Sequence, residues 1–449
     1  MLKSHFFKAL CLWKIMEHTN FNDSLLSFLQ SSPTPFHATD SMRNALIAEG
    51  FVELIEENNW VIEECRKYFV TRNESALIAF TTPELNFSQT GWRMIGAHTD
   101  SPCLKLKPNA QVDRFGYHQL GVEVYGGVLL HTWLDRDLSI AGRITLKTKA
   151  GDIVSRLVDF KDPIAVVPNL AIHLNRQANE GFSVNPQEEI LPILCGAENE
   201  FDLHELLKAQ LKKQYTDLPI DMILDFELSL YDTQPAALVG LHKEYICSAR
   251  LDNLLSCFVG LRALLDSDGQ RPSLLVCTDH EEIGSLSACG ANGPFLEDVL
   301  HRLTPNPEQY VQAVQRSMLV SADNAHALHP NYANKHDKNH APAINKGAVI
   351  KVNANQRYAT NSETASVYRD IAAQENYDVQ CFVVRSDMAC GSTIGPITSG
   401  EIGVPTIDIG LPTFGMHSIR ELAGSRDAYG LYKVLTRFTK RDKLISRLE

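Results

Sequence analysis

Acidic and histidine side chains follow predicted strands at several separate points of this 449-residue chain. Each comes after a short apolar run, and nearby small residues such as Gly96 and Ala322 favour a buried strand that opens into a tight loop. Ligand sites in open α/β sheets lie outside the carboxyl ends of the strands. We therefore expect one shared site for this set: His98, Asp252, Glu281, Glu282, Asp323 and His417.

Two histidines and several carboxylates, with no cysteine among them, form a nitrogen and oxygen donor set. Such a set suits zinc, and after zinc cobalt or manganese. A site this rich in carboxylates can hold two divalent ions with one carboxylate bridging them, which lowers the pKa of a shared water from 15.7 toward about 7. A general base is still required. The adjacent Glu281 and Glu282 fit a division in which one binds metal and the other faces the water.

Each of these residues alone also has an ordinary explanation. A single histidine after a strand is often a surface or hydrogen-bonded residue, and adjacent glutamates are common on solvated surfaces. The joint pattern of apolar runs, small residues and chemically matched side chains favours the metal site.

The elements that must position these residues alternate between strands and helices. The segments SLLVCTD, SMLVSAD, VQCFVVR and PTIDIG have strand character, and helices are expected over 22–32, from 39 or 40 to 49, over 362–375 and over 418–441. This alternation predicts an α/β fold. Residues 106–246 do not show this alternation of strands and helices. They contain short segments of alternating apolar and polar residues separated by glycines, which predict a mostly β insertion. The remaining parts, 16–105 and 247–449, would form the main domain, and 1–15 an extension of uncertain role.

The charge balance argues against two classes of partner. The chain has 42 Lys and Arg residues against 54 Asp and Glu, a net charge of −12, which opposes non-specific binding to nucleic acid or to anionic membranes. Ten scattered cysteines without a disulfide-scaffold spacing predict free, mostly buried thiols in a reducing compartment, so we expect a cytoplasmic protein with no membrane partner.

Several long motifs resemble those of the aspartyl aminopeptidase family of co-catalytic zinc metallopeptidases. They occur in consistent order over about 34–440: GAHTDSPCLKLKP at 96–108, NLAIHLNR at 169–176, SARLDN at 248–253, DHEEIGS at 279–285, SADNAHALHPNY at 321–332, KGAVIKVNANQRYAT at 346–360 and GLPTFGMHSIRE at 410–421. The resemblance implies a zinc-peptidase α/β/α sandwich interrupted by a β-rich dimerisation domain. It also implies a homo-oligomer, a dodecamer in the family.

The resemblance further implies roles for matching positions. His98, Asp252 and Asp323 would hold one zinc ion, and Asp252, Glu282 and His417 a second, with Asp252 bridging. Glu281 would be the general base. Asp100 would orient a ligand imidazole, although it is also a plausible turn residue. His173 would reach the active site of another subunit to steady the tetrahedral intermediate, and a ligand role for it is the lesser alternative.

Family members remove an N-terminal Asp or Glu from peptides, which requires a positive group for the substrate carboxylate. Lys351 matches that group, and His326 and Tyr358 match neighbouring substrate contacts. Lys351 also has a simpler reading as a surface lysine with a partly buried stem. Two other functions stay open: a related dinuclear zinc hydrolase, either a broader aminopeptidase or a deacylase, and a non-catalytic oligomeric scaffold.

Overall fold

A computed structural model describes residues 18–444 of the chain, so the predicted extension over 1–15 lies outside the described residues. The contacts divide the chain into two compact units. The first comprises residues up to Asp100, Ala236–Met416 and the residues from Glu421 onward, and the second comprises Ser101–Pro235 and His417–Arg420. The contacts define these two units but do not assign a role to either. The catalytic role expected for 16–105 and 247–449, and the oligomerisation role expected for 106–246, stay predictions.

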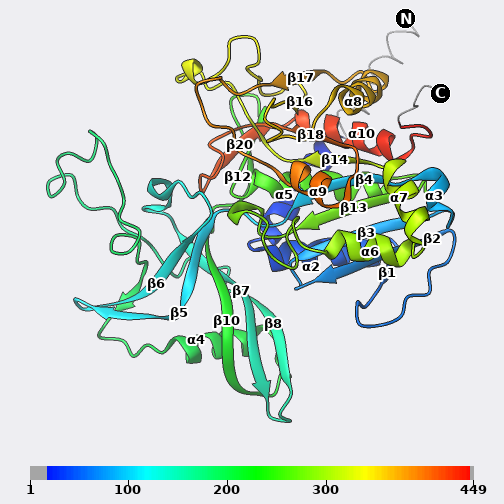
Figure 1. Cartoon of the computed structure of the whole chain (residues 1–449). Helices are drawn as coiled ribbons and strands as arrows, with labels where there is room; N and C mark the ends of the chain where they lie inside the picture. Colours follow the sequence, from blue (N-terminus) through cyan, green and yellow to red (C-terminus); the bar gives the residue numbers. More distant parts are fainter. Residues whose placement is uncertain (1–17, 445–449) are drawn as a thin grey trace, which may run out of the picture. The chain divides into compact units, whose positions relative to one another are not determined.

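A mixed sheet of nine strands forms the centre of the first unit, in the order β1-β2-β3-β13-β4-β14-β18-β16-β17. Strands β13, β4, β14 and β18 are parallel neighbours (Figure 1). Their carboxyl ends therefore meet at one edge. The bounds of the nine strands are Val52–Glu53, Arg66–Arg72, Ala76–Thr82, Ser273–Thr278 (β13), Arg93–His98 (β4), Met318–Ala322 (β14), Thr406–Gly410 (β18), Ala348–Lys351 (β16) and Val379–Phe382 (β17).

Hydrophobic cores cover both faces of this sheet, because successive strand side chains point to opposite faces. Ile95 of β4 belongs to one core and its neighbour Met94 to the other. The first core is closed by helical residues from 18–31, α2 (Pro35–Ala48), α5 (Leu251–Leu265), α8 (Ser362–Gln374) and α10 (Asp427–Thr439). The second is closed by α6 (Phe295–Leu303) and α7 (Pro307–Gln315). The expected α/β fold with helices on both faces is confirmed.

A smaller sheet in the first unit follows the order β11-β12-β20-β19-β15. Strand β12 (Tyr245–Ser248) runs antiparallel to β20 (Glu421–Gly424) and places Ser248 opposite Glu421. This pairing brings the start of α5 beside a segment distant in sequence. The other bounds are Ala237–Val239, Pro412–Phe414 (β19) and Ala325–His326 (β15).

The second unit has its own antiparallel sheet of six strands, in the order β8-β7-β10-β5-β6-β9. Helix α4 (Leu203–Gln214) contributes its buried leucines to a core shared with these strands. The strands are Cys103–Arg114 (β5), Tyr117–Tyr125 (β6), Leu138–Thr148 (β7), Ile153–Asp159 (β8), Ile193–Gly196 (β9) and Ile220–Asp232 (β10).

Several helix limits differ from the sequence expectation. The segment expected as a helix over 22–32 is already helical at residue 18 and remains so to residue 31. Helix α2 begins at Pro35, not at 39 or 40, because the Thr34 hydroxyl accepts a hydrogen bond from the backbone N–H of His37 and proline suits the first helical position. The expected helix over 418–441 is limited to Asp427–Thr439, because Glu421–Gly424 pairs as a strand. Helix α8 lies where it was predicted.

The nine cysteines of the described chain are all free, but only Cys257, Cys277 and Cys289 are fully buried, so the expectation of mostly buried thiols is wrong. Among residues 18–444, none of the helices has both the length and the apolar character needed to cross a lipid bilayer.

Candidate metal and active site

Three donor groups meet at the carboxyl edge of the central sheet. His98 ends β4, Asp323 follows β14, and Asp252 lies in the first turn of α5. The Nε2 atom of His98 lies 3.5 Å from Oδ1 of Asp252 and 3.6 Å from Oδ1 of Asp323. All three residues are buried, and one ligand atom from each lies within 4.8 Å of the others. This spacing suits a cation shared by the three side chains.

The loop after β13 brings the adjacent glutamates to the same place. Its single 3-10 turn spans Glu281–Ile283, and Oε2 of Glu281 lies 4.0 Å from Nε2 of His98. His98, Glu281 and Glu282 form a second group of donors within 4.8 Å. The Asp100 carboxylate fixes the loop, because its two oxygens accept hydrogen bonds from the backbone N–H groups of Glu281 and Glu282, each at 3.1 Å.

The crowded carboxylates shift one another's protonation. Burial, assisted by Asp323 and Asp252, raises the pKa of Glu281 to about 7, and burial followed by Asp252 raises the pKa of Glu282. Burial acts to lower the pKa of His98, but the surrounding carboxylates raise it overall. One imidazole and four carboxylates in a buried cluster form a hard nitrogen and oxygen donor set that fits divalent zinc.

Two residues that sequence reasoning did not single out support this cluster. Glu421 of β20 is buried and its Oε2 accepts a hydrogen bond of 2.8 Å from the backbone N–H of Asp252. The Asn253 side chain donates to the Ala322 carbonyl at 2.8 Å, which ties the start of α5 to the end of β14. Asn253 is the last residue of the motif SARLDN, and Glu421 is the last residue of GLPTFGMHSIRE. Membership of these motifs was the only feature of the sequence that pointed to a role for either residue.

A buried lysine lies beside the donor cluster. Lys351 ends β16, its side chain is 4% exposed, and its Nζ lies 3.1 Å from Oδ2 of Asp323. Tyr358 is buried, and its ring centre lies 5.5 Å from this Nζ. His326 is exposed by surface area, but the protein atoms packed around its ring, followed by the Lys351 charge, lower its pKa and favour the neutral imidazole. These residues can surround a ligand carboxylate.

The remaining expected site residues belong to the second unit. His417 is half-buried, and its Nδ1 lies 3.1 Å from the carbonyl oxygen of Gly127. His173 is exposed, and its neighbours Leu170, Ile172 and Leu174 are 58%, 48% and 76% exposed. Exposed apolar side chains in such number are typical of a surface that another protein covers.

A family model and several known proteins match nearly the whole length of the chain. A family model described as "Aminopeptidase I zinc metalloprotease (M18)" matches residues 28–439. A "Probable M18 family aminopeptidase 2" of Pseudomonas entomophila is 57% identical over 425 residues, which cover 94% of this chain and 99% of the relative. A protein with the same description from Ectopseudomonas mendocina is 58% identical over 416 residues, covering 92% of this chain and 96% of that one.

Solved structures give the same result. The chain is similar to one described as "Cryo-EM structure of the Ape4 and Nbr1 complex", with 39% identity, a TM-score of 0.91, and coverage of 94% of this chain and 86% of that chain. It is also similar to "Crystal structure of prApe1", with 30% identity, a TM-score of 0.86, and coverage of 96% and 97%. "Structure of S. cerevesiae mApe1 dodecamer" matches with 29% identity, a TM-score of 0.80, and coverage of 93% and 96%.

Proposed function

The chain belongs to the aminopeptidase I zinc metalloprotease family (M18) and is a zinc metalloaminopeptidase, and we propose that it removes N-terminal Asp and Glu residues from peptides. Aminopeptidase activity follows from the family. The preference for acidic residues is the finer statement, and it depends on the surroundings of Lys351.

The position of the Lys351 ammonium carries this preference. Asp323 presents Oδ1 toward His98 and Oδ2 toward Lys351, so one carboxylate can serve a cation and the lysine together. A lysine ammonium has three N–H donors, and contact with Asp323 leaves others for a substrate carboxylate. The charge-assisted hydrogen bond that results is stronger than one between neutral groups. His326 and Tyr358 would contact the same substrate side chain.

Two zinc ions per subunit are proposed, with cobalt or manganese as possible substitutes. His98, Asp252 and Asp323 would hold one ion, and Asp252, Glu282 and His417 the other. The backbone of His417 lies at most about 14 Å from that of Glu421, because only four chain steps separate them. Glu421 in turn accepts a hydrogen bond from the backbone N–H of Asp252. Bound zinc would polarise the scissile carbonyl and make a nearby water more acidic.

The protein groups then have separate tasks. The Glu281 carboxylate would take a proton from the attacking water and return it to the departing amine. Asp100 would hold both the loop that carries Glu281 and the imidazole of His98. His173 of another subunit would donate a hydrogen bond to the oxyanion that develops. The role of His173 requires the proposed homo-oligomer.

The oligomer proposed is a dodecamer, and the β-rich insertion is proposed as its dimerisation domain. The exposed apolar residues around His173 support a partner surface there, and a solved relative is described as a dodecamer. We also propose a cytoplasmic enzyme that acts on peptides, with neither nucleic acid nor a membrane as a partner.

A panel of aminoacyl amides tests the substrate preference. Zinc-loaded enzyme should hydrolyse Asp and Glu amides with a higher kcat/KM than Asn, Gln, Ala or Leu amides, and blocking the α-amine should abolish cleavage. Equal rates on Leu and Asp amides would show a broader aminopeptidase. Cleavage of N-acylated amino acids alone would show a deacylase, and inactivity of fully metallated protein a scaffold.

A further inference from the structure

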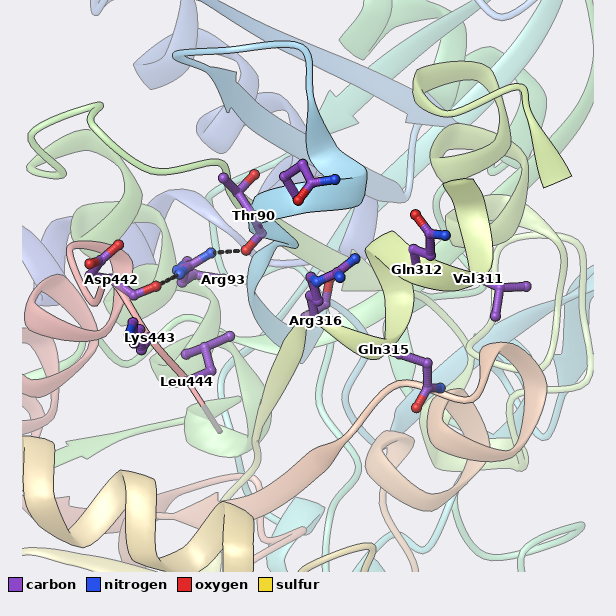
Figure 2. Close-up of a pocket in the computed structure, with 11 residues that line it drawn as sticks. Thr90, Arg93, Val311, Gln312, Gln315, Arg316, Asp442, Lys443 and Leu444 are labelled. Carbon is purple, nitrogen blue, oxygen red and sulfur yellow. Dashed lines mark hydrogen bonds between the residues drawn. The ribbon is translucent and has the colours of Figure 1, made fainter. Parts of the chain in front are cut away.

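A cavity lined by charged, amide and apolar side chains lies at the amino ends of the central strands, at the opposite end of β4 from the candidate metal site. Arg93 begins β4 and His98 ends it, so five strand steps of about 3.3 Å place the two ends of this strand about 17 Å apart. Strand β14 begins at Met318, directly after the lining residue Ser317. The cavity has a volume of 570 Å³ and is lined by Arg93, Ser317 and residues of α7 and the chain's C-terminal part (Figure 2). Sites for small molecules commonly measure about 300–1,000 Å³.

Arg93 lines this cavity as a buried cation, and none of the carboxylates within residues 18–444 forms an ion pair with it. It is 1% exposed, and its Nε donates to the Arg441 carbonyl at 2.7 Å and its Nη1 to the Thr90 carbonyl at 2.7 Å. Its other described bonds also go to carbonyl oxygens, including that of Asp442 (Figure 2). Burial lowers the pKa of Arg93 to about 10, which leaves the guanidinium charged at neutral pH.

Two further cations line the cavity. Arg316 donates one hydrogen bond to the carbonyl of Ser88, and Lys443 is exposed. Within residues 18–444, neither of them forms an ion pair. The lining carboxylate, Asp442, is already paired with Arg271 at 2.5 Å. The described lining therefore holds three cations and one carboxylate, a net positive charge, although the chain as a whole carries a net charge of −12.

We propose that this arginine cavity, defined by Arg93, Arg316 and Lys443, binds a small oxyanion, either a phosphate or a carboxylate group. An anion there would offset the buried guanidinium charge. The fork of Arg316 and the ammonium of Lys443 supply donors whose geometry suits oxyanions. Amide side chains of Gln89, Gln312 and Gln315 also line the cavity and can hold polar groups of a larger ligand.

Thermal unfolding of the full-length, zinc-loaded protein in inorganic phosphate, malonate or chloride at equal ionic strength tests this proposal. Phosphate, malonate or both should raise the melting temperature in a saturable way. Comparison of the phosphate titration with the malonate titration shows whether the cavity prefers phosphate or carboxylate groups. In Arg316→Ala/Lys443→Ala, the concentration for half of the effect should rise at least tenfold. Lys147→Ala/Lys149→Ala is the matched control, since it removes two exposed lysines from the second unit.

If Arg316→Ala/Lys443→Ala does not fold, a second variant of nearly unchanged side-chain size tests the same proposal. Gln89 is exposed, and Gln89→Glu adds a carboxylate to the cavity wall, so it should weaken anion binding while the melting temperature without anion is equal to or higher than that of the wild type. Phosphate can also bind zinc, but that effect would be equal in all variants. Equal anion effects in wild type, Arg316→Ala/Lys443→Ala and Gln89→Glu would overturn the proposal, as would an effect of chloride equal to that of both oxyanions.

Discussion

The Asp100 carboxylate lies 3.3 Å from Nδ1 of His98, while the opposite imidazole nitrogen faces the other donors. The same Nδ1 also lies 3.1 Å from the main-chain carbonyl oxygen of Asp100, so this residue fixes the ring orientation with two oxygens, and the negative charge of its carboxylate makes the imidazole a stronger ligand. Asp100 also accepts the two backbone N–H groups at the start of the Glu281 loop. One buried side chain thus orders two parts of the site.

Replacing Asp100 should therefore weaken zinc binding and turnover together. In Asp100→Asn, one oxygen becomes an NH₂ group that faces a backbone donor, and the negative charge beside His98 is lost. We expect a decrease of about 10- to 100-fold in zinc affinity or activity. Competition with a chelator measures the affinity, and Asp40→Asn on the exposed face of α2 is the control. Unchanged zinc affinity and turnover would contradict the orienting role.

The adjacent glutamates should separate in their effects. Glu281→Gln should retain zinc and lower kcat by about 10²–10⁴-fold, because a positioned general base contributes that much. Glu282→Gln should instead lower the zinc content. Metal analysis and a hydrolysis assay on the same preparations distinguish the two. Near-normal turnover in Glu281→Gln would exclude it as the base, and loss of zinc from both variants would make both residues ligands.

Much of the candidate site could be anticipated because its parts are local to strand ends. His98, Asp323 and Glu281 each follow an apolar strand, and parallel neighbours bring those ends to one edge. The support from Glu421 could not be anticipated in this way. It depends on the pairing of β12 with β20, which joins segments more than 170 residues apart.

The helix boundaries were less predictable for a similar reason. The residues after 418 have helical apolar spacing, but Glu421–Gly424 gains ladder hydrogen bonds from β12 and β19, and this tertiary pairing overrides the local preference. Two prolines flank Thr34: Pro33 follows the preceding helix, and Pro35 occupies the first position of α2, where its missing N–H costs nothing.

Substitution of Lys351 should change substrate preference more than turnover in general. Lys351→Met keeps a long stem and removes the ammonium, so kcat/KM for Asp and Glu amides should fall by about 10- to 100-fold, as expected for a lost hydrogen bond to a charged group. The rate on neutral amides should fall much less. Lys346→Met, an exposed lysine on the preceding loop, is the control. If acidic and neutral substrates lose activity in the same proportion, Lys351 supports the metal site through Asp323 and does not recognise the substrate.

Asp427 should make stability fall as the pH rises from about 4 to 6. This carboxyl is 1% exposed at the start of α10 and accepts backbone hydrogen bonds from Asn345 at 2.6 Å and Gly347 at 2.9 Å. Burial raises its pKa to about 6, above the usual value of about 3.9 in an unfolded chain. The folded state therefore binds more protons between these values, and this contribution to stability is lost as the pH rises through 6.

The variant Asp427→Asn isolates this contribution, because an amide does not titrate. We compare the free energy of unfolding of the variant with that of the wild type. The variant value minus the wild-type value should increase by about 1 kcal/mol between pH 5 and pH 7.5, because the wild type loses most of the Asp427 contribution over this range. Urea unfolding of both metal-free proteins at equal concentration measures it, which keeps zinc loss and assembly out of the comparison. A difference that stays constant with pH would mean that Asp427 is ionised throughout, held by its two backbone donors despite its burial.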